Sequence, residues 1–450
     1  MVINNETIVA ISTGSSSGAI SIVRMSGTDA VKIADKIFKT KSGKKPSDFE
    51  PRYLTLGEIS TENFKEQAMC VVFKAPKSYT GEDLVEFQCH GGTQIASGIM
   101  KQCVLCGARL AGNGEFTKRA FLNGKMSLSS AEGMMDMINA ESDAEVRAGY
   151  ELLTGNLSKL AYSAQEELTD ILSEIEVSFD YPEETIEYIT KAKVKQRLEA
   201  LSDTMQKTID TAEAGKLIKS GINVLIVGKP NVGKSSLLNN LLQKDKAIVT
   251  SVAGTTRDIV EGTFLLDDIK INLTDTAGIH DTNDIVEKIG VDKAKSLINM
   301  ADIILFLIDS NSDYSAEDEE IFNQVKDKKY IVIKTKTDLE SKNTKHFDNE
   351  IEISSLTGNG IDKLKNKILE LTKISNKSNS TVIITNERHK DALCRANESL
   401  KRAISNIDND SLDLVSIDIK QAYLDIGEIT GNTTSEDIID SIFSKFCLGK

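Results

Sequence analysis

The segment GKPNVGKS at residues 228–235 constrains the fold of this 450-residue chain more than any other feature. It fits the pattern Gly, any four residues, Gly, Lys, Ser, and it lies between an apolar run at 222–227 and a predicted helix at 236–242. In this strand–loop–helix setting, backbone N–H groups of the loop and the helix N-terminus bind phosphate. We expect Lys234 to contact the outer phosphates and the Ser235 hydroxyl to coordinate Mg²⁺. The sequence therefore predicts a P-loop nucleotide-binding domain.

A second motif, DTAG at residues 275–278, follows the predicted strand KINLT in the order expected downstream of a phosphate loop. The Asp275 carboxylate can hold Mg²⁺ through a water molecule, and the Gly278 N–H can contact the terminal phosphate. Ras-like enzymes place a water-orienting glutamine directly after this motif, but this chain has Ile279. Because a hydrocarbon side chain cannot orient water, we expect another residue to do so.

A third motif, TKTD at residues 335–338, follows the apolar segment YIVIK and bears on the choice of base. The Asp338 carboxylate can accept two hydrogen bonds from the guanine edge, whereas adenine offers no such pair of donors. Thr335 stands where GTPases usually have asparagine, a substitution that concerns nucleotide affinity more than base choice. The segment ISSL at 353–356 resembles the element that closes over the base. Together these motifs predict GTP rather than ATP.

The chain divides into regions of different pattern, in keeping with the roughly three domains that its length predicts. Residues 1–118 alternate short β-rich runs with turns, which indicates an α+β region. Residues 119–217 and 375–450 carry apolar residues at helical spacing, with a helix break at FDYPEE (179–184). Residues 218–374 alternate strands with helices, which predicts a mostly parallel sheet covered by helices.

Composition excludes several classes of protein. No apolar run reaches the roughly 18 residues of a membrane span, and the N-terminus lacks the pattern of a signal peptide. Six cysteines are too few for a disulfide scaffold, so we expect a cytoplasmic protein. The net charge of −14 argues against a chain that coats nucleic acid by charge alone. Residues 131–190 carry 15 acidic and 2 basic side chains, which we interpret as a solvated helix face.

Several longer segments are not general nucleotide-binding motifs. They are IVRMSG, YTGEDLVEFQCHGG and GEFTKRAFLNGKMSLSSAE near the N-terminus, FDYPEE in the helical region, VTSVAGTTRD and DTNDIVEKIG after the phosphate loop, and the terminal FCLGK. In this order, over essentially the whole chain, they resemble the tRNA-modification GTPase family MnmE, also called TrmE. The resemblance implies a multidomain α/β and α fold: an N-terminal α+β folate-binding and dimerisation domain (1–118), a helical domain in two parts (119–217 and 375–450), and an inserted Ras-like P-loop G domain (218–374).

The same resemblance assigns two kinds of metal ion to the G domain. It implies that Mg²⁺ is held by the hydroxyls of Ser235 and Thr256. It implies that K⁺ is held by Asn231, Thr250, the Val252 carbonyl and Thr255. A monovalent cation beside the phosphates can supply the positive charge that an arginine finger would otherwise supply.

The resemblance also assigns the water-orienting role to Glu287, which without it would be interpreted as an ordinary exposed helix glutamate. The remaining implied contacts are with GTP. The full GTP-binding set is Asn231, Val232, Gly233, Lys234, Ser235, Ser236, Thr250, Ser251, Val252, Ala253, Gly254, Thr255, Thr256, Asp275, Thr276, Ala277, Gly278, Thr335, Lys336, Asp338, Ser354 and Ser355.

A folate site is implied for the N-terminal domain. The family binds 5-formyltetrahydrofolate, or another one-carbon tetrahydrofolate, and the matching positions are Arg24, Glu86, Lys125 and Lys450. A carboxylate suits the donor–acceptor edge of a pterin, and cations suit its glutamyl tail. By composition alone these four residues are surface charges. Cys447, in the terminal motif, is a candidate reactive thiol, the alternative being a small packing residue in the last helical turn.

The implied function is a potassium-dependent GTPase that modifies carbon 5 of the wobble uridine of certain tRNAs with an aminomethyl or carboxymethylaminomethyl group. The implied partners are a second copy of the chain, tRNA, and an MnmG (GidA)-like protein using FAD and NADH, in a heterotetramer or larger complex. Two alternatives remain: an Era- or Der-like ribosome-assembly switch, and a dynamin-like membrane-remodelling GTPase, for which membrane-contact segments are lacking. Folate binding distinguishes the three.

Overall fold

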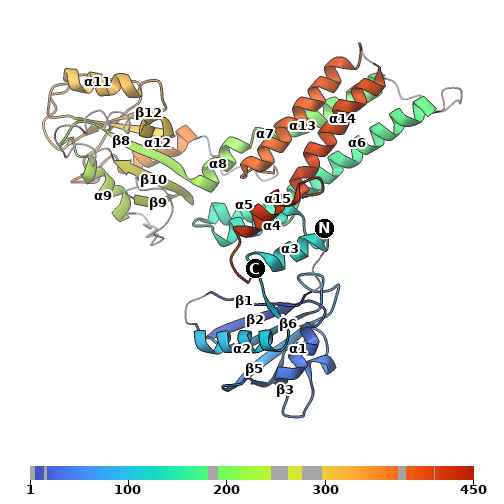
Figure 1. Cartoon of the computed structure of the whole chain (residues 1–450). Coiled ribbons are helices and arrows are strands. Elements are labelled where there is room, and N and C mark those ends of the chain that lie inside the picture. Colours follow the sequence, from blue (N-terminus) through green and yellow to red (C-terminus); the bar gives the residue numbers. More distant parts are fainter. Residues whose placement is uncertain are drawn as a thin grey trace, which may run out of the picture. The chain divides into compact units, whose positions relative to one another are not determined.

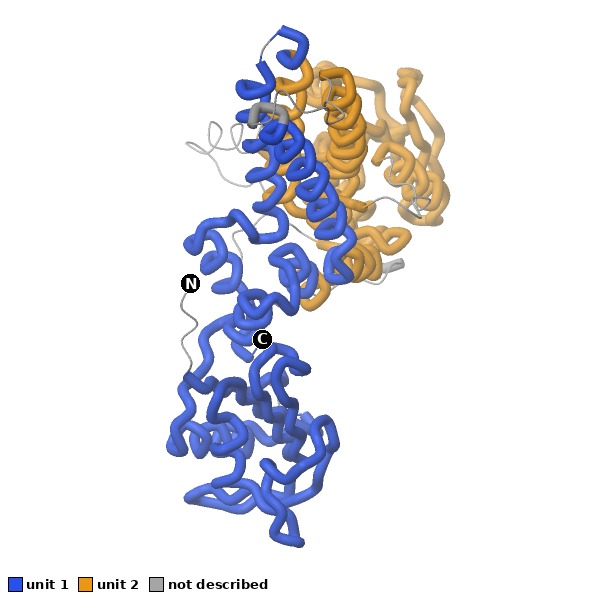
Figure 2. Tube along the Cα trace, turned by 90° about the vertical axis from the view of Figure 1, so that its right-hand side faces the viewer, with its two compact units in different colours: residues 1–135, 152–190, 406–450 blue, residues 136–151, 191–405 orange. Residues whose placement is uncertain are grey.

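The chain forms two compact units, which are coloured blue and orange in Figure 2. Unit 1 comprises residues 1–135, 152–190 and 406–450, and unit 2 comprises 136–151 and 191–405. The structure is a computed structural model, and it describes residues 6–14, 18–180, 191–244, 262–275, 296–372, 382–409 and 411–449. Both units contain helices from the two segments predicted to be helical, so the predicted domain boundaries stay a prediction.

Unit 1 is built on a seven-stranded sheet with the strand order β3-β4-β5-β6-β2-β1-β7 (Figure 1). Neighbouring strands are antiparallel except for β1 and β7, which are parallel. The strands are β1 (Ile8–Ile11), β2 (Ile20–Ser26), β3 (Phe38–Lys39), β4 (Thr55–Ser60), β5 (Lys65–Phe73), β6 (Leu84–His90) and β7 (Arg109–Leu110). The helices are α1 (Ala30–Ile37), the 3-10 helix η1 (Pro46–Asp48), α2 (Thr93–Leu105), α3 (Glu115–Leu122), α4 (Leu128–Ile138), α6 (Asn156–Asp180), α14 (Leu412–Thr430) and α15 (Glu436–Ser444).

The two faces of this sheet are buried by different helices. Helices α1 and α2 cover one face, where alternate strand residues such as Val23 and Met25 form the larger apolar core. On the other face, Ile8 and Ala10 of β1 pack with Phe116 of α3 in a smaller cluster. Side chains alternate along β2, so Arg24, between Val23 and Met25, points to this second face.

The helices of unit 1 include the pair α6 and α14, which pack along each other. The Gln165 Nε2 of α6 donates a hydrogen bond to the Tyr423 carbonyl of α14 at 3.1 Å. Gly427 of α14 allows this approach, because a Cβ there would lie 2.7 Å from Gln165 Nε2. The described part of α6 reaches Asp180, and the rest of the FDYPEE segment lies outside the described residues, so the predicted helix break there stays a prediction.

Unit 2 is built on a six-stranded sheet with the strand order β13-β12-β11-β8-β10-β9. It is parallel except for the β9–β10 hairpin, which confirms the predicted mostly parallel sheet. The strands are β8 (Ile222–Val227), β9 (Gly262–Leu266), β10 (Ile269–Asp275), β11 (Ile303–Asp309), β12 (Tyr330–Thr335) and β13 (Glu350–Glu352). The helices are α5 (Asp143–Leu153), α7 (Lys191–Ile209), α8 (Ala212–Ser220), α9 (Lys234–Lys244), α11 (Ala316–Val325), α12 (Ile361–Thr372) and α13 (Glu387–Asn406).

Helices cover both faces of this sheet. Alternate residues of β8, including Ile222 and Ile226, pack against α9 and α12 on one face. Leu225 and Val227 point to the other face, where α11 contributes Val325. A central strand that buries both sides is mostly apolar, which is why the run at 222–227 shows no polar alternation and Asn223 is its one polar residue.

The chain enters and leaves the sheet region of unit 2 at adjacent points. The Thr211 hydroxyl, just before α8, donates to the Val382 carbonyl at 3.1 Å and accepts from the Ile384 N–H at 3.1 Å. Gly215 of α8 lies so close to the Ile384 carbonyl that no Cβ would fit. Neighbouring ends are what the insertion of one domain into another requires. Across the described ranges, no helix is both long and apolar enough to span a bilayer.

Candidate functional site

The phosphate loop joins the end of β8 to the start of α9, as predicted. Gly228 and Gly233 have φ values of 152° and 101°, and a Cβ at Gly228 would lie 2.6 Å from the Leu307 carbonyl oxygen. Asn231 has a φ of 61°, in the left-handed region that asparagine adopts more readily than most residues. The two glycines and the asparagine are therefore the residue types that this loop path requires.

Lys234 lies at the centre of the loop and is 7 % exposed. Its Nζ donates to the carbonyl oxygens of Gly228 at 2.8 Å and Lys229 at 3.0 Å, so the loop wraps around the ammonium group. Lys234 is also the first residue of α9, whose first-turn N–H groups have no partner within the helix. This combination of a buried cation and a helix N-terminus suits a phosphate group.

Thr335 ties the base-recognition motif to the phosphate loop. Its Oγ1 is buried, 2.6 Å from the Val232 carbonyl oxygen and 3.1 Å from the Ile308 carbonyl oxygen. A hydroxyl thus connects the two motifs at the position where related GTPases usually carry an amide. Lys336, with a φ of 58°, places its Nζ 2.6 Å from Asp309 Oδ2 at the end of β11. Asp309 is not among the site residues predicted from the sequence, although a carboxylate at the end of an apolar parallel strand is typical of a ligand-binding position.

The predicted base-recognition residue Asp338 and the segment 353–356 meet. Ser354 Oγ donates to Asp338 Oδ1 at 2.6 Å and accepts from the Thr357 N–H at 3.3 Å. Asn240 Nδ2 of α9 donates to the Ser355 carbonyl at 2.8 Å. These bonds hold the exposed Asp338 carboxylate and its loop next to the helix that follows the phosphate loop.

Ser235 and Ser236 follow Lys234 in the first turn of α9, and both are exposed. Apart from Asp275, the remaining predicted G-domain residues are outside the part of the chain that the structure describes. At Asp275 the backbone ends β10, whose register places Asp275 beside Ile226 at the end of β8. Strand β10 therefore delivers the DTAG motif to the sheet edge that carries the phosphate loop. The residues outside the described ranges are Thr250, Ser251, Val252, Ala253, Gly254, Thr255, Thr256, Thr276, Ala277, Gly278 and Glu287.

In unit 1, Arg24 and Glu86 form a cross-strand pair. They are in register between β2 and β6, and Arg24 Nε donates to Glu86 Oε1 at 2.8 Å. The guanidinium carbon lies 5.4 Å from the ring centroid of Tyr79 and 5.7 Å from that of Phe116. The pair is mostly buried, with side chains 21 % and 14 % exposed. Both aromatic residues lie in segments that carry the family resemblance, yet nothing in the sequence showed that they meet Arg24.

Lys125, the third predicted folate-binding residue, is not bonded to the Arg24–Glu86 pair. Its Nζ donates to the Pro76 carbonyl oxygen at 2.9 Å, and it forms neither a hydrogen bond nor an ion pair with Arg24 or Glu86. A Cβ at Gly81 would lie 3.5 Å from the Lys125 side chain, so the loop 76–81 packs beside it.

The C-terminal tail lies on the sheet of unit 1. Ser12 Oγ donates to the Gly449 carbonyl at 3.1 Å, and Leu448 forms an antiparallel bridge with Asn113. Gly449 has a φ of 89° and leaves no room for a Cβ against the Ile11 carbonyl oxygen. Cys447 is exposed, and Lys450 is not within the described residues. The tail thus ends next to β1, the strand that pairs with β2.

A charged network supports the segments around this tail. Arg119, 3 % exposed, donates to both carboxylate oxygens of Glu82 at 3.2 Å and to Glu115 at 3.0 Å. Burial alone would raise the pKa of Glu115, but hydrogen bonds from Arg109, the Gly112 N–H and Arg119 outweigh it and lower the pKa to about 2. The motifs YTGED and GEFTKRAF are therefore joined by buried ion pairs.

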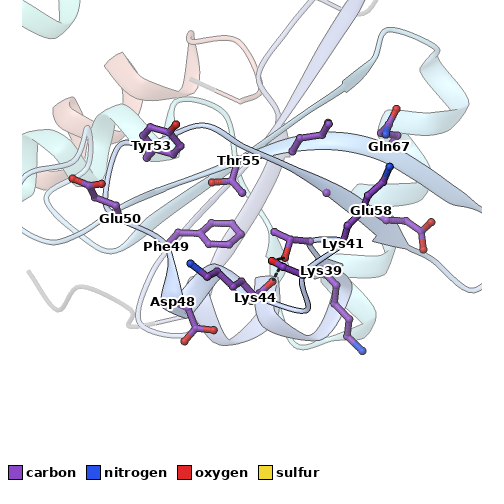
Figure 3. A pocket seen from close by; sticks show the side chains of 14 residues that line it. Lys39, Lys41, Lys44, Asp48, Phe49, Glu50, Tyr53, Thr55, Glu58 and Gln67 are labelled. Atoms are coloured by element: carbon purple, nitrogen blue, oxygen red, sulfur yellow. Dashed lines mark hydrogen bonds between the residues drawn. The ribbon is translucent and has the colours of Figure 1, made fainter.

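A separate cavity of about 770 Å³ opens at the β3–β4 edge of the same sheet (Figure 3). It is lined by polar and charged side chains such as Lys44 and Glu58, with Phe49 and Tyr53 at its wall. Arg24, Glu86 and Lys125, the predicted folate-binding residues that the structure describes, do not line it.

A parallel sheet with a phosphate loop after β8, a DTAG strand beside it and an anchored Asp338 defines the class of this protein as a P-loop GTPase. Comparison with known proteins narrows the class to a family. The family described as GTP-binding protein TrmE N-terminus matches residues 7–125, and the family described as MnmE helical domain matches residues 128–447.

Two curated relatives match along their whole length. The tRNA modification GTPases MnmE of Clostridioides difficile and Alkaliphilus metalliredigens are 43 % and 41 % identical to this chain, over 99 % of it and 99 % of their own length. The chain therefore belongs to the MnmE (TrmE) family. A solved structure of Aquifex aeolicus Era bound to GDP and aluminium fluoride is 31 % identical over 39 % of this chain and 66 % of its own, with a TM-score of 0.28, too low to add to the assignment.

Proposed function

We propose that this protein hydrolyses GTP in a potassium-dependent cycle that serves the modification of carbon 5 of the wobble uridine of certain tRNAs. The observation that carries the proposal is the presence of two sites in one chain of this family. Unit 2 holds the phosphate loop and the anchored Asp338, and unit 1 holds the Arg24–Glu86 pair between two aromatic rings.

At the GTP site, the proposed ligands of Mg²⁺ are the hydroxyls of Ser235 and Thr256. The proposed ligands of K⁺ are Asn231, Thr250, Val252 and Thr255, all of which offer oxygen atoms, the donors that hard cations prefer. Such a cation supplies positive charge beside the phosphates, and Glu287 is the proposed water-orienting residue. We expect faster GTP hydrolysis in KCl than in NaCl of equal ionic strength, and equal rates would exclude the K⁺ assignment.

At the site in unit 1, the proposed ligand is 5-formyltetrahydrofolate or a related tetrahydrofolate, which supplies a one-carbon unit when bound. A carboxylate and a guanidinium beside two aromatic rings fit a flat, polar-edged ring system. Lys125 and Lys450 are proposed to meet the glutamyl carboxylates, and Cys447 remains a candidate nucleophile. Absence of binding to 5-formyltetrahydrofolate by the purified protein would remove this half of the proposal.

We further propose that the protein acts in the cytoplasm as a homodimer, with an MnmG (GidA)-like FAD- and NADH-using partner in a heterotetramer or larger complex, and with tRNA. In this proposal GTP hydrolysis changes conformation and does not act on the uridine. The deciding experiment is mass spectrometry of tRNA nucleosides from cells that lack this protein. We expect aminomethyl-type groups to be lost from wobble uridines, and an unchanged nucleoside profile would refute the proposed function.

A further inference from the structure

The phosphate loop is tied to helix α11 by a side chain to which the nucleotide motif assigns no role. Lys229, the second residue of GKPNVGKS, places its Nζ 2.6 Å from Asp318 Oδ2 and donates to Ser315 Oγ at 2.9 Å. The Lys229 side chain is 18 % exposed and the Asp318 side chain 3 % exposed. The pair is thus largely shielded from water, unlike most lysine–carboxylate pairs on a surface.

Asp318 has more than a helix-capping role. It is the third residue of α11, and its Oδ2 accepts the Ser315 N–H at 2.9 Å in a capping box. Its Oδ1 is buried and has no hydrogen-bond partner among the described residues. A capping box functions at the surface without a cation, whereas a buried carboxylate with a free oxygen is costly unless a positive charge compensates it. Lys229 supplies that charge, so Asp318 holds the Lys229 side chain in place.

The backbone of Lys229 faces the interior of the loop. Its carbonyl oxygen accepts a hydrogen bond from Lys234 Nζ at 3.0 Å. It is followed by Pro230 and then by Asn231 in its left-handed conformation. The same residue is therefore fixed from outside by α11 and in turn fixes, through its carbonyl, the ammonium group at the centre of the site.

We propose that the Lys229–Asp318 pair is a positioning device for the phosphate loop. By fixing the first half of the loop, it sets where Asn231 and Lys234 lie relative to the outer phosphates and the cation beside them. The inference rests on the proposed potassium-dependent hydrolysis of GTP. It adds Lys229 and Asp318 to the residues proposed for that reaction, as residues that position the loop without touching the nucleotide. GDP lacks the terminal phosphate, so its affinity depends less on this placement.

The test uses the full-length protein in four variants and one control. Lys229→Met and Asp318→Asn each leave a buried group without its partner, and the double variant removes both charges. Lys229→Arg keeps the charge and the donors. The control is Glu319→Gln, which removes the neighbouring carboxylate of α11, 48 % exposed and 3.6 Å from Lys345. For each protein we would measure kcat for GTP hydrolysis, the half-activating KCl concentration, the Kd for GDP and the Tm.

The single variants are expected to lower kcat about tenfold, raise the half-activating KCl concentration and change the Kd for GDP less than about threefold. Lys229→Arg should retain most of the activity, and Glu319→Gln should behave as the parent protein. The decisive variant is the double one. Its Tm should recover, because no buried charge is left unpaired, while kcat stays low, because the loop is no longer held.

Two results would overturn the inference. If kcat recovers together with Tm in the double variant, or if the single variants lower Tm alone, the pair serves stability only. If the Kd for GDP rises as much as kcat falls, the whole loop is disturbed and positioning of the outer phosphates is not the cause. Failure of the proposed function gives a different result, because the parent protein itself would then show no preference for KCl over NaCl. In that case the positioning role of the Lys229–Asp318 pair is tested by kcat and the Kd for GDP alone.

Discussion

The Thr335 hydroxyl connects the guanine-recognition motif to the phosphate loop through a bond of 2.6 Å to the Val232 carbonyl oxygen. Thr335→Ala leaves that buried carbonyl without its donor, and a typical hydrogen bond contributes about 1 kcal/mol. We therefore expect about fivefold weaker binding of both GTP and GDP, measured by titration with fluorescent nucleotides. The preference for GTP over ATP should persist because Asp338 is untouched. Thr335→Ser keeps the hydroxyl and serves as the control, and equal loss in both variants would contradict this interpretation.

Glu115 gives unit 1 a predictable response to acid. Its pKa is lowered from 4.5 to about 2, so the ionised form is favoured in the folded state. The stability it contributes is present above about pH 4.5 and is lost as the pH falls toward 2. We expect the difference in unfolding free energy between the parent and Glu115→Gln to be largest above pH 5 and to shrink across this range. Glu58→Gln, at an exposed ion pair with Lys65, should change stability little at any pH. A difference that stays constant down to pH 2 would exclude the role of ionised Glu115.

Residue spacing predicts which groups should contact the nucleotide, but it does not show which side chains support those groups. The phosphate loop and TKTD are short motifs whose chemistry depends on local order, so Lys234 and Asp338 could be named from sequence. The partners Asp309, Asp318 and Glu82 contribute through contacts between residues far apart in the chain. A single sequence, taken alone, does not show which of these distant residues pair with one another. The family resemblance supplied Arg24 and Glu86 but not the rings that flank them.

At the scale of elements, the short β-rich segments of the N-terminal region were predicted well. The segments ETIVAIS, GAISIVRMSG and LVEFQCHGG each contain a strand of the first sheet, and MCVVFKAP contains the end of β5. The two-residue strands β3 and β7 have no signal of their own, since they are defined only by pairing with β4 and β1. The position of the C-terminal tail depends in the same way on its partner strand.

That tail can be displaced by one substitution. Gly449 has a positive φ and no room for a Cβ next to the Ile11 carbonyl, so Gly449→Ala should release the last residues from β1. If the tail completes the proposed folate site, affinity for 5-formyltetrahydrofolate should fall at least about tenfold, measured by calorimetry, while GTP hydrolysis is unchanged. Gly43→Ala is a matched control, because Gly43 has a φ of 80° but open space around its Cβ position. Unchanged folate affinity in Gly449→Ala would exclude the tail from the site.

At the scale of the whole molecule, the two proposed ligand sites belong to different compact units. The Arg24–Glu86 pair lies in unit 1, and the phosphate loop lies in unit 2. Each unit has its own sheet and its own apolar cores. Substitutions at one site should therefore leave the local chemistry of the other intact. The net charge of −14 does not conflict with a tRNA substrate, because residues 131–190 account for most of the excess acid.

Arg24→Ala tests whether the two sites serve one reaction. Loss of the guanidinium removes both the partner of Glu86 and the cation beside Tyr79, so binding of 5-formyltetrahydrofolate should be lost. GTP hydrolysis in KCl should stay within about twofold of the parent, because Arg24 belongs to unit 1 and the phosphate loop belongs to unit 2. In cells that express only this variant, wobble uridines should nevertheless lack the modification. The same loss is expected in cells that express only Thr335→Ala when GTP is limiting. Arg52→Ala, which removes an exposed arginine that donates to the Lys77 carbonyl, is the control for an arbitrary loss of charge in unit 1. Normal tRNA modification by an Arg24→Ala protein that no longer binds folate would separate the two sites and refute a shared reaction.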